Sequence, residues 1–309
     1  MKAVIAGGTG FIGRALVRSL TGDGHEVVVL SRRPSGNPPA PGVTYAPFDG
    51  ATGDGWLRHL DGAAVLVNLV GENIAAGYWT AARKARLRQS RLDAGAAVMD
   101  ALRRAADPPP VLVQGSATGF YGDRGEALVD EAAPAGTGFL AELARNWEAS
   151  TAGAEALGLR RAVARTAVVL GAGGGALPRM LAPYRFFLGG PLGPGTQYFP
   201  WIHLADEVAA IRLLMEHPQA SGPFNLAAPG AITQDSLARA LGRALGRPAV
   251  LRAPTLLLRL ALGEMAQELF LNGVRAVPAK LAQLGFVFRF PDIGTALADI
   301  LRAGGRSHG

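Results

Sequence analysis

The amino-acid sequence predicts an α/β fold: a doubly wound parallel sheet with a smaller carboxyl-terminal α/β domain. Apolar segments of strand length alternate with helical patterns as far as residue 170, and such alternation implies right-handed crossovers between parallel strands. A glycine-rich turn joins the first strand to the first helix. From Gly171 onward, glycine clusters and then short elements replace the alternation, which indicates the second domain.

The glycine-rich turn spans residues 7–13, between an apolar strand at 2–6 and an amphipathic helix at 14–20. Its glycine spacing permits a tight turn that approaches a pyrophosphate closely and packs the helix on the strand. The amino terminus of the helix then faces the phosphates. We predict a dinucleotide-binding turn, and the alternative is a purely structural turn. The residues predicted to contact the cofactor here are Gly7, Thr9, Gly10, Phe11, Ile12 and Gly13.

The second predicted strand, residues 24–30, indicates which dinucleotide binds. Ser31, Arg32 and Arg33 stand at its carboxyl end, and no acid is present there. An NAD site usually has an acid at this place for the ribose 2′-hydroxyl, whereas an NADP site has cations for the 2′-phosphate. The sequence therefore favours NADP(H). The alternative is that the two arginines lie in an exposed turn before Pro34.

Composition narrows the possible chemistry. The chain has 309 residues with 49% hydrophobic content, enough to bury a full core in one large domain or two unequal ones. It has no cysteine, which excludes disulfides and thiolate catalysis, and its five histidines are scattered, so we expect no metal. The net charge of +7 comes almost wholly from arginine and favours anionic small molecules.

Charge and hydropathy also indicate which partners to expect. A nucleic-acid interface would need a basic stripe with interleaved aromatics, and the arginine-rich run 83–91 lies instead on a predicted helix next to the cofactor edge. The amino terminus is too short in apolar residues for a signal peptide, and charged residues interrupt the apolar stretch 256–271. We expect a cytoplasmic monomer or homodimer that binds a small-molecule substrate and neither nucleic acid nor a membrane.

The third and fourth strands are expected at residues 43–48 and 64–70. The third ends in Asp49, which should lie near the adenine. After the fourth, the backbone at Leu69, Val70, Gly71 and Glu72 should pass the nicotinamide side of the cofactor. A long helix follows with a small-residue core face, and Pro108 to Pro110 end it.

The fifth strand, residues 111–116, should deliver Ser116, Thr118 and Tyr121 to the carboxyl edge of the sheet, where open α/β sheets bind ligands. A helix at 139–157 and a sixth strand at 161–170 complete this part. The segment 171–200 has glycine clusters around an apolar strip, which suits either a mobile lid over a cleft or an irregular linker.

The remaining chain is divided between the two predicted domains. Residues 204–217 read as a helix and 224–228 as a strand. We predict a cofactor domain at 1–170, to which 201–228 return, and a substrate domain formed by 171–200 and 229–302. The tail at 303–309 is expected to be disordered.

Seven sequence motifs are distributed along the chain: GGTGFIG at 7–13, SRRP at 31–34, NLVGENI at 68–74, SATGFYGDRG at 116–125, LGAGGGALPRM at 170–180, FPWIH at 199–203 and GFVFRFP at 285–291. Together they resemble one family, the epimerase-like atypical short-chain dehydrogenase/reductases, which are NAD-dependent epimerase/dehydratase-like proteins with a small carboxyl-terminal domain. The resemblance covers nearly the whole chain. It implies a Rossmann domain of the extended type, NADP binding and an oxidoreductase or epimerase activity without an agreed substrate.

The catalytic pair of the wider superfamily, Tyr-x-x-x-Lys, is missing, because no lysine follows any tyrosine at that spacing. By resemblance, Leu140 and Ala144 stand in the places of this pair. Arg91 stands in the place of the usual Asn, and Ser116 resembles the upstream Ser.

The candidates for catalysis are therefore Tyr121, Ser116, Glu72 and Arg91. Tyr121 is the first choice as proton donor, with a packing role under its loop as the alternative. Glu72 could contact cofactor or substrate, or be a solvated loop acid.

Two further side chains have open alternatives. His203 suits a general base or, together with Asp206, a structural role at a helix start. Arg165 could reach an anionic substrate or form an ion pair at the sheet edge.

Two functions stay open at this point. One is an NADP(H)-dependent oxidoreductase, epimerase-like, that acts on a small carbonyl or hydroxyl substrate. The other is a non-catalytic NADPH-binding sensor or scaffold protein.

Overall fold

The computed structural model describes residues 1–32 and 40–306. The chain divides into two compact units. Unit 1 comprises Met1–Ser116, Leu143–Ala164 and Val208–Pro223, and unit 2 comprises Ala117–Glu142, Arg165–Glu207 and the chain from Phe224 onward. A separate cluster of buried apolar residues lies in each unit.

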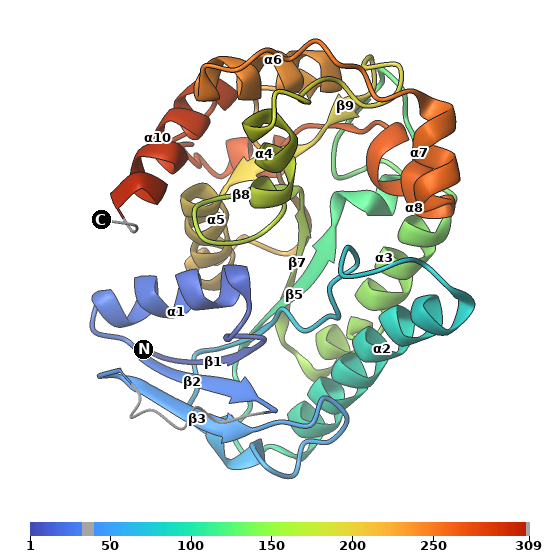
Figure 1. Cartoon of the computed structure of the whole chain (residues 1–309). Helices are drawn as coiled ribbons and strands as arrows, with labels where there is room; N and C mark the ends of the chain where they lie inside the picture. Colours follow the sequence, from blue (N-terminus) through green and yellow to red (C-terminus); the bar gives the residue numbers. More distant parts are fainter. Residues whose placement is uncertain (33–39, 307–309) are drawn as a thin grey trace. The chain divides into compact units, whose positions relative to one another are not determined.

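The helices and strands follow one another along the whole described chain (Figure 1). The strands are β1 (Lys2–Ala6), β2 (Glu26–Ser31), β3 (Val43–Pro47), β4 (Val65–Asn68), β5 (Val111–Ala117), β6 (Leu128–Val129), β7 (Arg160–Thr166), β8 (Val168–Leu170), β9 (Tyr198–Phe199), β10 (Trp201–His203), β11 (Gly222–Leu226), β12 (Ile232–Thr233) and β13 (Arg275–Ala276). The α-helices are α1 (Phe11–Gly22), α2 (Ala81–Arg104), α3 (Phe139–Ala149), α4 (Leu177–Arg185), α5 (Leu204–Glu216), α6 (Gln234–Leu245), α7 (Thr255–Leu262), α8 (Glu264–Ala266), α9 (Ala279–Gln283) and α10 (Ile293–Arg306). Short helical turns occur at η1 (Leu57–His59), η2 (Thr118–Tyr121), η3 (Ala152–Leu157) and η4 (Gln267–Leu271).

The main sheet has seven strands in the order β11-β7-β5-β4-β1-β2-β3. β1 pairs in parallel with β2 on one side and with β4 on the other, so that Ala6 lies opposite Leu30 and Asn68. The strand order therefore reverses beside β1, and open α/β sheets bind ligands at the carboxyl edge of such a switch point. The predicted doubly wound sheet is confirmed.

The core of unit 1 explains why the strands are apolar at almost every position. Val4 and Ala6 of β1 are buried in one cluster with Ala94 and Val98 of α2. Because side chains alternate along a strand, Ile5 points to the opposite face. Figure 1 shows α1 and α2 on opposite faces of strands β1–β3. Both faces are thus covered, as parallel sheets require.

Unit 2 has its own core under α4, α6 and α10. Leu181 and Tyr184 of α4, Leu237 and Leu241 of α6, and Leu297 of α10 are buried together in it. Short strand pairs complete the unit: β8 with β10, β9 with β12, and β6 with β13. β6, β8 and β10 come from segments that the sequence analysis assigns to the cofactor domain, whereas β9, β12 and β13 come from the predicted carboxyl-terminal domain.

Two predicted elements are each divided in the structure. The strand predicted at 161–170 ends at Thr166 and resumes as β8, because the Ala167 N–H bonds to Leu226 O and β8 pairs with β10 in a separate sheet. The helix predicted at 139–157 ends at Ala149 and is followed by η3. Tertiary hydrogen bonds of this kind have no signal in the local sequence pattern.

Two predicted boundaries also differ. Residues 117–142 group with unit 2 and not with the predicted cofactor domain 1–170, since β6 pairs with β13 and Tyr121 bonds to Asn225. The tail predicted to be disordered from 303 is helical as far as Arg306, because α10 continues to that residue. Residues 307–309 lie outside the described part.

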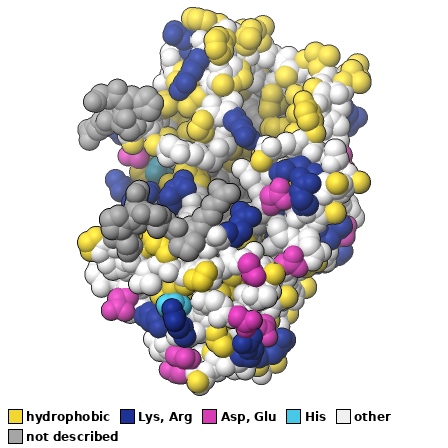
Figure 2. Space-filling view, turned by 60° about the horizontal axis from the view of Figure 1, so that its bottom comes forward, with side chains coloured by type: hydrophobic (Ala, Val, Ile, Leu, Met, Phe, Trp, Pro, Cys, Tyr) yellow, Lys and Arg dark blue, Asp and Glu magenta, His cyan; other side chains and the backbone are white. Residues whose placement is uncertain are grey.

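The distribution of surface charge and the apolar content of the helices both concern the partners that the protein can bind. Figure 2 shows Lys and Arg side chains interspersed with Asp and Glu on the face it presents. Among the described helices, none combines the length and the apolar composition that crossing a bilayer requires.

Candidate functional site

The glycine turn lies in unit 1 between β1 and α1, and its packing depends on the absence of side chains. Gly7 has φ +86°, a conformation that favours glycine, and its Cα lies so close to β4 that a Cβ would be 2.9 Å from the carbonyl carbon of Leu69. A Cβ on Gly13 would clash with the carbonyl oxygen of Gly7. The Gly10 N–H donates to that same oxygen at 2.9 Å. The first turn of α1 is therefore held directly on the glycine turn.

The amino terminus of α1 is equipped to bind an anion. Its cap residue is Gly10, which makes no side-chain capping bond, and its first turn holds no acid. The first N–H groups of a helix have no partner within the helix, and they carry the positive end of its dipole. Thr9 and Gly10 are exposed at this end, while Phe11 and Ile12 are half-buried. These residues fit the pyrophosphate of a dinucleotide.

The carboxyl end of β2 fits a phosphate better than a ribose hydroxyl. Ser31 is buried at the strand end, and its carbonyl accepts the Phe48 N–H at 3.0 Å. Arg32, the next residue, is exposed. No acid follows β2 before Arg33 in the sequence, and Arg33 itself lies outside the described residues. This end therefore offers a cation and no carboxylate to the adenosine ribose.

Asp49, predicted near the adenine, is engaged in its own turn. Its Oδ1 accepts the N–H groups of Ala51 at 2.8 Å and Thr52 at 2.9 Å. These two backbone hydrogen bonds, that of Ala51 first, hold the pKa of Asp49 below its usual range. The carboxylate thus stabilises the loop after β3, and its adenine contact stays a prediction.

The segment after β4 is fixed by polar contacts at the strand end. The Asn68 amide donates to Gln114 Oε1 on the neighbouring strand at 3.0 Å, and Asn68 Oδ1 accepts the Val70 N–H at 3.2 Å. Leu69 and Val70 are half-buried, and Gly71 is exposed. These residues therefore present backbone beside the glycine turn, and their contact with the nicotinamide side stays a prediction.

Arg91, on α2, holds the segment after β4 in place through hydrogen bonds. It is 8% exposed and donates to Leu87 O at 2.9 Å and to Glu72 O at 3.2 Å. Its guanidinium lies 4.8 Å from the centre of the Trp147 ring. Burial lowers the pKa of Arg91 to about 10, with Glu72 acting in the opposite direction, so it is charged at neutral pH. A Cβ on Gly71 would lie 2.9 Å from the Arg91 Cζ, so the guanidinium packs closely against the backbone there.

Glu72 is paired with cations of α2. Its Oε1 lies 2.9 Å from Arg83 Nη1, and its Oε2 lies 3.8 Å from Arg86 Nε. Its backbone N–H donates to Ser90 Oγ at 3.2 Å. The structure therefore brings Glu72 and Arg91 together, and the Glu72 side chain links the loop to α2; its contact with cofactor or substrate stays a prediction.

Ser116 has a partner that sequence reasoning missed. Its hydroxyl donates to Glu148 Oε1 over 2.6 Å, the short range of a hydrogen bond to a carboxylate. Ser116 is buried at the end of β5, and Glu148 is on α3. Leu140, Ala144 and Glu148 follow at four-residue spacing, so a search of one further helical turn past the missing Lys would have found the acid.

Tyr121 belongs to unit 2, and its side chain is fully buried. Its hydroxyl donates to Asn225 Oδ1 at 2.7 Å and accepts from Arg165 Nη1 at 2.9 Å. Burial raises the pKa of Tyr121 although Arg165 lowers it. The Arg165 guanidinium also lies 3.6 Å from the centre of the Phe120 ring. These contacts favour the packing alternative for Tyr121, and its role as proton donor stays a prediction.

His203 and Asp206, at the start of α5, both accept backbone hydrogen bonds. His203 Nδ1 accepts the Ala205 N–H at 3.0 Å. The Asp206 carboxylate accepts the N–H groups of Arg289 at 2.8 Å and Phe290 at 2.9 Å. Both contacts favour the structural alternative over general-base catalysis.

The predicted lid or linker contains the helix α4. Leu181 and Tyr184 on this helix are buried in the core of unit 2, whereas Phe186, Phe187 and Leu188 after it are exposed. Two side chains of the apolar strip therefore belong to the core, and the three apolar residues after α4 are exposed.

Comparison with known proteins gives the family. Residues 3–227 match the model of the NAD dependent epimerase/dehydratase family, and residues 253–300 match a domain of unknown function, DUF1731. The chain is 40% identical to the epimerase family protein MT2273 of Mycobacterium tuberculosis over 293 residues, 95% of each chain. The resemblance predicted from the motifs is confirmed.

Two solved structures are similar over nearly the whole chain. The crystal structure of human epimerase family protein SDR39U1 (isoform 2) with NADPH has a TM-score of 0.87 at 34% identity and covers 98% of this chain and 99% of that one. A nucleoside-diphosphate sugar epimerase from Corynebacterium glutamicum has a TM-score of 0.77 at 32% identity and covers 97% of this chain and 58% of that one.

Proposed function

The chain belongs to the NAD dependent epimerase/dehydratase family, and on this premise we propose that it is an NADP(H)-dependent oxidoreductase, epimerase-like, for a small carbonyl or hydroxyl substrate. One observation carries the proposal: the uncapped, acid-free amino terminus of α1 on a glycine turn, combined with Arg32 after β2. The human relative solved with NADPH supports the same cofactor.

Unit 1 supplies the groups that bind the cofactor. The first N–H groups of α1 bind the pyrophosphate, and Gly7, Gly10 and Gly13 let it approach. Arg32 binds the 2′-phosphate by a charge-assisted contact. When bound, NADPH supplies the hydride for reduction of a carbonyl. The backbone after β4, held by Asn68 and Arg91, orients the nicotinamide side.

The proton is handled by Ser116 and Glu148. In the oxidising direction Ser116 would accept the proton of the substrate hydroxyl and pass its own proton to the Glu148 carboxylate, and the hydride of the substrate carbon would go to bound NADP⁺. In the reducing direction the same transfers run in reverse, and the substrate oxygen receives a proton. Tyr121 is the alternative donor.

A second candidate function is a non-catalytic NADPH-binding sensor or scaffold. It is favoured by the missing Tyr-x-x-x-Lys and by the contacts of Tyr121, whose hydroxyl is occupied by Asn225 and Arg165. The two functions differ in whether any substrate consumes bound NADPH.

The test is absorbance screening of the purified protein with NADPH against panels of carbonyl compounds. An oxidoreductase consumes NADPH with at least one carbonyl, and the Ser116→Ala variant reduces that consumption. NADPH binding without consumption by any carbonyl, at substrate concentrations up to the millimolar range, would favour the sensor.

A further inference from the structure

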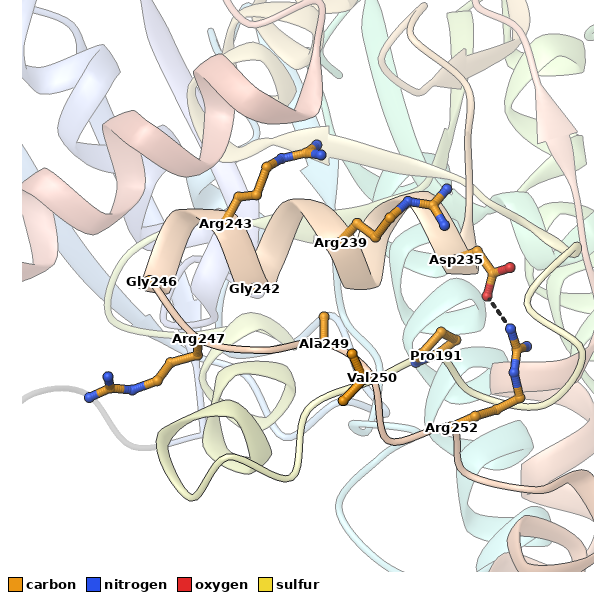
Figure 3. Close-up of a pocket in the computed structure, with 10 residues that line it drawn as sticks. All are labelled: Pro191, Asp235, Arg239, Gly242, Arg243, Gly246, Arg247, Ala249, Val250 and Arg252. Atoms are coloured by element: carbon orange, nitrogen blue, oxygen red, sulfur yellow. Dashed lines mark hydrogen bonds and ion pairs between the residues drawn. The ribbon is translucent and has the colours of Figure 1, made fainter.

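Unit 2 carries a groove of about 630 Å³ that shares no residue with the glycine turn. One wall is α6, and the other is the segment that follows it, residues 247–252 (Figure 3). The lining contains four arginines, one acid and a small apolar floor: Arg239, Arg243, Arg247, Arg252, Asp235, Gly242, Gly246, Pro191, Ala249 and Val250.

The cations in this groove are only partly neutralised. Arg252 Nη2 lies 2.9 Å from Asp235 Oδ1, the contact that Figure 3 marks. The other three arginines form no ion pair with a carboxylate of residues 1–32 and 40–304; these are Arg239, Arg243 and Arg247. The lining therefore carries a net positive charge on exposed side chains, with Arg239 and Arg243 on α6 and Arg247 pointing away from them (Figure 3).

The helix α6 and the contacts of the side chains determine where these three arginines lie. Arg239 and Arg243 are one helical turn apart on α6, and like charges at this spacing destabilise a helix. Arg239 donates to Ser236 Oγ at 3.1 Å. Arg247 lies over the Phe187 ring, 4.6 Å from its centre. The helix therefore tolerates a repulsion that an anion between the guanidinium groups would remove.

The floor of the groove is narrow because Gly242 has no side chain. A Cβ on Gly242 would lie 2.7 Å from Arg247 O and 2.8 Å from Ala249 Cβ, so the segment after α6 packs directly on the helix. Pro191 and Ala249 line the floor, and Val250 is exposed beside it. A ligand there would meet apolar surface as well as cations.

We propose that this groove binds a small molecule that carries two or more adjacent phosphate groups next to an apolar or aromatic part. Guanidinium groups bind phosphate oxygens in pairs, and residues one turn apart on a helix are about 5–6 Å apart at Cβ, a spacing that adjacent phosphates can bridge. The hollow is of the size of small-molecule pockets, about 300–1,000 Å³, whereas an acidic protein surface needs no hollow.

The test is calorimetric titration of the full-length protein with tripolyphosphate, in the presence of saturating NADPH so that the glycine turn is occupied. The groove variant is Arg239→Gln/Arg243→Gln. The control variant, Arg259→Gln/Arg302→Gln, removes the same charge from α7 and α10, outside the groove. Circular dichroism of both variants checks that they fold.

We expect the unmodified protein and the control to bind tripolyphosphate equally, and the groove variant to bind at least about tenfold more weakly. Raising the salt concentration should weaken binding to the unmodified protein. Equal affinity in the groove variant and the control would overturn the proposal. So would binding that appears only without NADPH, which would assign tripolyphosphate to the glycine turn. Binding of poly-glutamate without binding of tripolyphosphate would overturn it in favour of an acidic polypeptide. None of these outcomes depends on whether the protein turns over a carbonyl.

Discussion

Thr166 Oγ1 donates a hydrogen bond to Glu207 Oε1 at 2.8 Å, in a place where Glu207 is fully buried. The second carboxyl oxygen, Oε2, has no hydrogen-bond partner among the described residues. Burial raises the pKa of Glu207 from its ordinary value of 4.5 to about 8, against the opposing effect of the Thr166 bond. Glu207 is therefore a neutral acid at neutral pH.

This pKa predicts how stability depends on pH. Between about pH 4.5 and pH 8 the folded protein keeps the Glu207 proton while the unfolded chain has lost it, so the free energy of unfolding falls as pH rises. The slope approaches about 1.4 kcal/mol per pH unit within this window. Urea denaturation of Glu207→Gln at several pH values should show a smaller slope than the unmodified protein. The exposed Glu126→Gln is the control and should keep the full slope, and an unchanged slope in Glu207→Gln would contradict the assignment.

The Arg32→Gln change should weaken NADPH binding. Loss of one charge-assisted contact to the 2′-phosphate lowers affinity about 10- to 150-fold, nearer the low end because Arg32 is exposed. Affinity for NADH, which lacks that phosphate, should be unchanged. Calorimetry measures both, with Arg18→Gln on the exposed face of α1 as the control. Equal affinities of the unmodified protein for NADPH and NADH would rule out the NADP preference.

Ser116→Ala and Glu148→Gln should each lower turnover of a confirmed substrate. Positioned acid-base help contributes about 10² to 10⁴ in rate, and the two residues act as one hydrogen-bonded pair, so the double variant should be little slower than either single one. NADPH affinity should stay the same. The control is Glu155→Gln, whose side chain is half exposed beside Arg161. Full turnover in Ser116→Ala would remove the pair from the mechanism.

Tyr121→Phe tests the packing alternative. The change leaves Asn225 and Arg165 without a buried hydroxyl partner, so it should lower the free energy of unfolding by about 1–3 kcal/mol. The folded variant should keep its turnover. Urea denaturation measures the first effect and steady-state kinetics the second, with Tyr45→Phe as the control. A folded variant whose turnover falls by about 10² or more would restore Tyr121 as the proton donor.

The strand, glycine turn and helix at the amino terminus could be predicted from the sequence, because their signal is mostly local. The contact that requires a glycine at position 13 is with Gly7, six residues earlier, and Arg32 follows directly on β2, although the close approach of Gly7 to Leu69 is long-range. The alternation of strands and helices also gives the sheet, because burial of both faces makes whole strands apolar.

The catalytic half could not be predicted in the same way. Glu148 meets Ser116 only after α3 packs beside β5, 32 residues away in the chain. The partner of Tyr121 is Asn225, 104 residues later. Contacts between residues so far apart in the sequence leave no periodic pattern in it. The family resemblance does not identify the residues that take over the role of Tyr-x-x-x-Lys, because that pair is missing from this chain.

Unit 1 is built from three separate segments of the chain, and this affects how the protein folds during synthesis. Its three segments end at Ser116, Ala164 and Pro223, and unit 2 is interleaved between them. A ribosome therefore cannot complete either unit before most of the chain has been made, and β5 stays without its neighbour β7 until residues 160–166 have been made. Such long-range pairing slows folding and prolongs exposure to aggregation. A fragment that stops after residue 170 lacks part of both units, so expression of the cofactor half alone should depend on chaperones far more than expression of the full chain.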